Sequence, residues 1–202
     1  EGRMKWSDTL PIADAWKSPS GGMYEWDIGR EADLFTFGKL MISNSDNTAT
    51  DHLIQHVGRT NVEAMFATMG NSHAQLPLFG TLEMFKLKWA TDPNITDRYV
   101  LATEAERRTI LDSLASVPRT DLGTNGVSQA SPTRISTIEW FATTRENCEA
   151  MFWLAANGST QVREILSAST PFVQVGGHWK YVGYKGGSEP GVVSMTYLLE
   201  RQ

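Results

Sequence analysis

The hydrophobic pattern of this chain changes period near its C-terminal end, and this change constrains the fold most. Residues 178–185 and 192–199 show the two-residue alternation that is typical of β-strands. The glycine-rich residues 186–191 lie between them and predict the turn of a β-hairpin. Upstream of residue 157, apolar residues recur at helical spacing instead. The sequence therefore predicts an α+β fold, with helices first and an antiparallel hairpin last.

Helical spacing and capping residues together predict where the upstream helices lie. Thr36 is expected to cap one short helix, and Thr103 is expected to cap a longer helix that Pro118 stops. The predicted helices cover residues 36–42, 48–57, 61–69, 81–89, 104–117 and 144–156. Residues 6–33 contain proline and glycine among scattered tryptophans, which predicts packed loop with short strand. Residues 119–137 are rich in Gly, Ser and Thr and predict a long loop.

Length, charge and cysteine content exclude several classes of protein. The 202 residues suit one domain, residues 1–202, and the 41% of hydrophobic residues can form its core. The net charge is −5 and no run of Lys or Arg occurs, so nucleic acid is not an expected partner. The single cysteine, Cys148, excludes an internal disulfide framework. The longest apolar run, residues 150–156, is too short for a membrane span, which takes ~20 residues.

Two short motifs carry chemical information. Residues 45–47, Ser-Asp-Asn, lie where one predicted helix ends and the next begins. All three residue types cap helices, so this motif alone is explained as an ordinary cap. Residues 185–188, Lys-Gly-Gly-Ser, lie at the end of the first hairpin strand. Alone, they are explained as a glycine turn beside a solvated lysine.

Taken together, in this order and with helices between them, the two motifs resemble those of the β-lactamase-related serine hydrolases, which include class A β-lactamases and penicillin-binding proteins. The strings at residues 40–51 and 184–191 carry the resemblance, and residues 1–3 resemble the segment just after that family's nucleophile helix. The resemblance covers nearly the whole chain. It implies a helical lobe beside an antiparallel sheet, with the active site between them.

The resemblance also implies acyl-enzyme chemistry on a small amide, ester or β-lactam-like substrate, without a cofactor or a metal ion. Ser45 would relay protons, and the charge of Lys185 would polarise the substrate and attract an anionic one. Asn47 and Ser188 would bind the substrate, with the backbone N–H of Ser188 as one oxyanion donor. Gly187 would let the substrate approach the strand closely.

The chain departs from the family pattern in its nucleophile. No serine among the 202 residues has a lysine three positions later, so the Ser-x-x-Lys motif is absent from them. By resemblance, we expect the nucleophile helix upstream of Glu1 and a further strand and helix after Gln202, so the domain is expected to be truncated at both ends. The alternative is a catalytically inactive module that keeps the penicillin-recognising fold and binds a peptide or a small ligand.

Further expectations concern residues in and near the motifs. Gly186 stands where the family has a hydroxyl residue, and Glu189, directly after Ser188, is expected to repel an anionic substrate. Glu83 falls in an amphipathic helix and is interpreted as a surface residue rather than as the base that hydrolyses an acyl-enzyme. Asp46 is expected to be held by backbone N–H groups at a helix end.

The other candidates are interpreted as structural. His52 and His56 are spaced i, i+4 beside Asp51, but no third metal ligand is evident, so a polar helix face is predicted. Cys148 is expected to be a buried small hydrophobe in its apolar helix. Further core residues are expected at Trp140, Phe141, Phe152 and Trp153. The resemblance implies a secreted or periplasmic location, one cysteine is equally compatible with the cytoplasm, and the oligomeric state stays open.

Overall fold

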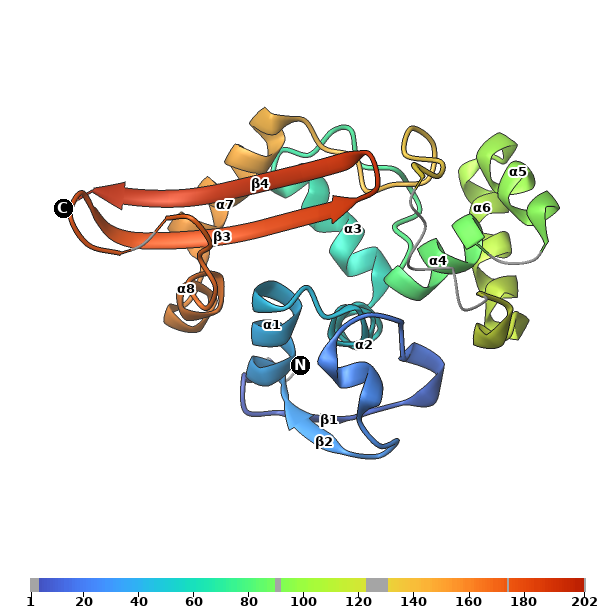
Figure 1. Cartoon of the computed structure of the whole chain (residues 1–202), viewed down its shortest axis with the longest axis horizontal. Coiled ribbons are helices and arrows are strands. Elements are labelled where there is room, and N and C mark those ends of the chain that lie inside the picture. The colour runs from blue at the N-terminus through green and yellow to red at the C-terminus, as the bar shows by residue number, and fades with distance from the viewer. Residues whose placement is uncertain (1–3, 90–91, 123–130, 174, 202) are drawn as a thin grey trace.

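Figure 1 shows the computed structural model of the chain, which describes residues 4–89, 92–122, 131–173 and 175–201. In these ranges the helices are α1 (Leu34–Ser43), α2 (Asn47–Val57), α3 (Arg59–Thr68), α4 (Thr81–Trp89), α5 (Pro93–Leu101), α6 (Glu104–Ser113), α7 (Thr144–Asn157) and α8 (Thr160–Leu166). The strands are β1 (Thr9–Pro11), β2 (Glu31–Asp33), β3 (Trp179–Glu189) and β4 (Val192–Arg201). The short 3-10 helices are η1 (Asp14–Trp16), η2 (Gly22–Glu25), η3 (Leu114–Ser116) and η4 (Arg119–Leu122). Residues 1–3, and residues 123–130 of the predicted loop, lie outside the described residues.

The arrangement of the elements confirms the predicted α+β fold. In Figure 1 the hairpin of β3 and β4 runs along the upper part of the molecule, with α1, α2 and α8 below it and α5 and α6 beyond its turn. Met151 of α7, Leu166 of α8 and Leu198 of β4 form a small core between the hairpin and these two helices. In the described ranges, no helix has both the length and the apolar character that crossing a membrane requires.

The hairpin has a tighter turn than predicted. Antiparallel pairing runs without interruption from Tyr181 opposite Glu200 to Glu189 opposite Val192, which leaves only two residues, 190 and 191, for the turn. Gly191 has a φ of 87°, which a side chain rarely allows, so it supplies the reversal. Residues 186–189 therefore continue β3 instead of forming the predicted turn. Their side chains alternate between the two faces of the strand.

The N-terminal third forms a compact layer around α1 and α2. β1 pairs with β2 in antiparallel register, and the buried side chains of Ile12, Met23 and Phe37 pack against α2. The carboxylate of Asp33 accepts from the N–H of Thr36, at 2.8 Å, and caps α1. The prediction that Thr36 caps this helix is therefore wrong, and the cap lies three residues earlier because Asp33 is the stronger acceptor for the free N–H groups.

A second core lies between α4, α5 and α6. Its buried residues include Phe79, Leu87, Tyr99 and Leu114. The start of α4, at residue 81, and the capping box of α6 agree with the predictions. α6 ends earlier than predicted, because the chain tightens into η3. α5 and α8 were not predicted, since both are short and their polar residues hide the helical period.

α7 forms as predicted, but its expected burial is largely wrong. Met151 is buried against α8 and β4, and the adjacent Phe152 is 68% exposed because successive helical residues point about 100° apart. Cys148 is exposed, and Trp140 is 45% exposed with its indole N–H donated to the carbonyl of Phe79, at 3.0 Å. An apolar run in the sequence therefore did not identify the buried face.

Candidate active site

Ser45 lies between α1 and α2, at a sharp change of chain direction. Asn44 is the C-cap of α1, and Asp46 is the N-cap of α2. Ser45 has a φ of 51°, in the left-handed region that costs a residue with a Cβ atom about 1 kcal/mol or more. The residue is nevertheless exposed. The junction therefore holds a strained serine at the surface.

The side chain of Asp46 holds this junction in place through hydrogen bonds to the backbone. Its side chain is completely buried, Oδ1 accepts from the N–H of Ala49 and Oδ2 accepts from the N–H of Met23, each at 2.9 Å. Gly21, with a φ of 113°, passes so close that a Cβ atom there would lie 2.6 Å from Cγ of Asp46. The prediction that backbone N–H groups hold Asp46 is confirmed, and the contact requires glycine at position 21.

Lys185 of β3 contacts Ser45 at the junction between α1 and α2. Its Nζ donates to Oγ of Ser45 at 2.6 Å, although the two residues lie 140 positions apart in the sequence. Nζ also donates to the carbonyl of Gly186. Burial lowers the pKa of Lys185 below its usual value. Because Oγ of Ser45 accepts this bond, the hydroxyl can donate its own proton elsewhere.

The predicted substrate-binding residues are Asn47, Gly187 and Ser188, and each lies within three sequence positions of Ser45 or Lys185. Asn47 opens α2, and its Nδ2 donates to the carbonyl of Pro19 at 2.7 Å, which orients the amide and leaves one N–H. Gly187 is exposed, and a Cβ atom there would meet nothing within 4 Å. Ser188 is also exposed, and the regular pairing of β3 puts its side chain on the face opposite to that of Lys185, which leaves its backbone for the predicted role. In the described residues β3 pairs with β4 alone, so its other edge has no strand beside it.

A buried charge cluster lies at the far end of the same strand. Lys88 of α4 has a fully buried side chain, and its Nζ donates to both carboxylate oxygens of Glu189, at 2.7 and 2.9 Å, and to Glu139. Glu189 is therefore paired with a buried ammonium, and its repulsion of an anionic substrate stays a prediction. Lys88 and Glu139 were missed. A lysine among the apolar residues of α4 was the only available signal.

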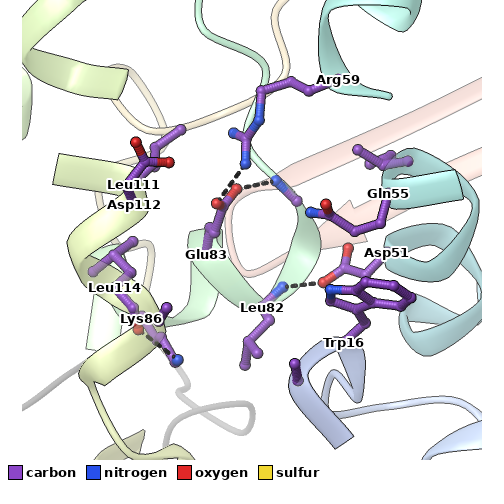
Figure 2. A pocket seen from close by; sticks show the side chains of 14 residues that line it. Trp16, Asp51, Gln55, Arg59, Leu82, Glu83, Lys86, Leu111, Asp112 and Leu114 are labelled. Carbon is purple, nitrogen blue, oxygen red and sulfur yellow. Dashed lines mark hydrogen bonds and ion pairs between the residues drawn. The ribbon is translucent and has the colours of Figure 1, made fainter. Parts of the chain in front are cut away.

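A separate pocket of about 380 Å³ lies between α2, α4 and α6 (Figure 2). Oε1 of Glu83 accepts from Arg59 at 2.6 Å, and Oε2 accepts from the N–H of Gly80 at 2.6 Å. The interpretation of Glu83 as a solvated surface residue is therefore wrong. Nearby, burial raises the pKa of Asp51 to about 6, and its Oδ2 accepts from the N–H of Leu82 at 2.9 Å. None of the predicted site residues lines this pocket.

The two histidines of α2 do not share a polar face. His52 is completely buried, its Nδ1–H donates to the carbonyl of Thr48 at 2.7 Å, and its Nε2 accepts from the N–H of Ala13 at 2.9 Å. Burial lowers the pKa of His52, and these partners fix the neutral ring with both nitrogens engaged. His56 is exposed. Among the described side chains, no three His, Cys, Asp or Glu residues gather as metal ligands.

Known proteins resemble the chain in both sequence and fold. Residues 1–115 match the Beta-lactamase enzyme family, and this range contains Ser45 and Asn47 but not the β3 residues. The crystal structure of a β-lactamase from Sphaerobacter thermophilus DSM 20745 has the same fold, with a TM-score of 0.63 and 20% sequence identity. The alignment covers 98% of this chain and 61% of that one, so this chain spans less than two thirds of that β-lactamase. No curated protein sequence matches. Because the family match over residues 1–115 covers more than half of its length, the chain belongs to the β-lactamase enzyme family.

Proposed function

We propose that this chain is the proton-relay and substrate-binding part of a β-lactamase-like serine hydrolase. The enzyme would act through an acyl-enzyme on an amide or ester, of the β-lactam or peptide type. The hydrogen bond from Lys185 to Ser45 carries this proposal, because it joins the two sequence motifs, which lie 140 positions apart in the chain. The nucleophilic serine and its lysine would come from residues outside these 202.

The relay follows from the donor and acceptor capacity of Ser45. Its oxygen accepts from Lys185, so its proton is free to pass to the leaving nitrogen of an amide. The partly desolvated ammonium of Lys185 is then a better proton source than a solvated lysine, because burial lowers its pKa. Nucleophilic attack and protonation of the leaving group are the two steps that acyl transfer from an amide requires.

Substrate binding would use the open edge of β3. An extended acyl or peptide group can pair with backbone groups on an open strand edge. Gly187 leaves room above the strand, and the remaining N–H of Asn47 can donate to a substrate carbonyl. Lys185 supplies the positive charge for a carboxylate. The substrate class that fits is therefore a small amide or ester with an anionic group.

The test is acylation of the protein with its native upstream residues. After incubation with a penicillin-type probe, intact mass should show one covalent adduct, and Ser45→Ala and Lys185→Ala should each slow its formation about 10²-fold. Ser43→Ala is the matched control, since the Ser43 hydroxyl donates to the neighbouring Asn44 side chain instead. No adduct in any variant, with the probe still binding reversibly, would favour the catalytically inactive binding module.

A further inference from the structure

β3 is attached to the helices at two separated points on one face. Lys185, Gly187 and Glu189 share that face, because side chains alternate and the pairing of this stretch with β4 is regular. Lys185 is bonded to Ser45, and Glu189 is bonded to Lys88. The four residue-to-residue steps from Lys185 to Glu189 span about 13 Å. The open space over Gly187 therefore lies between two fixed points.

The second attachment joins three segments of the chain. Lys88 belongs to α4, Glu189 to the end of β3, and Glu139 to the segment before α7. That segment also supports the hairpin turn, since a Cβ atom on Gly191 would lie 2.8 Å from the ring of Pro132. Buried charges of this kind require their partners, because an unpaired one is strongly destabilising. The cluster therefore defines where the end of β3 can lie.

We propose that Lys88 and Glu189 are positioning residues for the substrate-binding strand, and that they set the place of Gly187 and Ser188 relative to Ser45. This inference rests on the proposed function, because it concerns the strand that would hold the acyl group. Neither residue touches the reacting atoms. Their effect is exerted through β3, whose residue 188 is adjacent to Glu189. A small displacement of a positioned group is enough to slow catalysis strongly.

Two matched variants separate positioning from general stabilisation. Glu189→Ala and Glu139→Ala each remove one carboxylate, with side chains 15% and 16% exposed, and each leaves Lys88 paired with the other carboxylate. Both remove one carboxyl group from the same cluster, at positions of similar side-chain exposure. Only Glu189→Ala cuts the connection between α4 and β3.

The experiment measures acylation by a penicillin-type probe in the protein with its native upstream residues. Glu189→Ala should lower the acylation rate constant at least tenfold and change the probe's reversible binding constant less than threefold, and Glu139→Ala should change neither beyond threefold. Hydrogen exchange of the hairpin amides should quicken in Glu189→Ala alone. Equal rates in the two variants, or a normal rate in Glu189→Ala, would overturn the inference.

The same experiment keeps the two proposals distinguishable. If the unsubstituted protein forms no adduct, the proposed hydrolase function fails. The exchange measurement then still decides the positioning of β3. Faster exchange confined to Glu189→Ala supports it, and equal exchange in both variants contradicts it.

Discussion

Substitution of Asp46 tests how the junction that carries Ser45 is held. Asp46→Ala removes the N-cap of α2, which costs about 1 kcal/mol. It also leaves the buried N–H of Met23 without an acceptor, which costs about 1–3 kcal/mol. The expected loss in the free energy of unfolding is therefore about 2–4 kcal/mol. At about 2–4 °C for each kcal/mol in a chain of this size, Tm should fall by roughly 5–15 °C.

The control for this prediction is Asp33→Ala. Asp33 caps α1 through one hydrogen bond to the N–H of Thr36, and its side chain is only partly buried, so the loss should stay near 1 kcal/mol. Urea unfolding monitored by circular dichroism gives both values on the same scale. If Asp46→Ala is no more destabilising than Asp33→Ala, then the buried bond to Met23 does not support the junction.

Two other perturbations probe the same region. Gly21→Ala should destabilise the protein by at least about 2 kcal/mol, because the new Cβ atom would overlap Asp46 and the backbone has a positive φ. Gly22→Ala, where the new Cβ atom meets open space, should change stability by less than about 1 kcal/mol. Equal midpoints of urea unfolding in the two variants would contradict this prediction. Because the pKa of Asp51 is raised from 3.8 to about 6, the native state keeps a proton that the unfolded chain has released between these pH values. The stability of the unsubstituted protein relative to Asp51→Asn should therefore fall by about 2 kcal/mol as pH rises from 4 to 6.5, and a difference that does not vary with pH would refute the assignment.

Local signals made the position of the Ser45 junction predictable. Helix caps and turns are set by neighbouring residues, so the position of residues 45–47 between two helices followed from the sequence. The contact between Ser45 and Lys185 followed from the paired motifs. In contrast, Thr36 was predicted to cap a helix because Thr is a good cap. The prediction did not recognise that Asp33, three residues earlier, is the residue that accepts from the free N–H groups.

Long-range contacts account for what the sequence did not reveal. The pairing of Lys88 with Glu189 joins residues 101 positions apart, and nothing in either neighbourhood indicates the other. For the same reason, the sequence analysis treated the carboxylate of Glu189 as an unpaired charge. The exposure of Cys148 and Phe152 depends on which face of α7 meets α8 and β4, and an apolar run does not define a face.

The stability of this region and its proposed chemistry place opposite demands on the same residues. Ser45 has a left-handed backbone, and Lys185 is partly buried with a lowered pKa, so both are less favourable than common alternatives at a helix junction or on a strand. A purely structural role requires neither feature, because a glycine would satisfy the turn and an apolar side chain would fill the strand face. The buried bonds of Asp46 and the pairing of Lys88 with Glu189 hold the segments that carry these two residues. A strained serine and a desolvated lysine that neighbouring buried contacts hold in place are expected where the geometry serves a reaction.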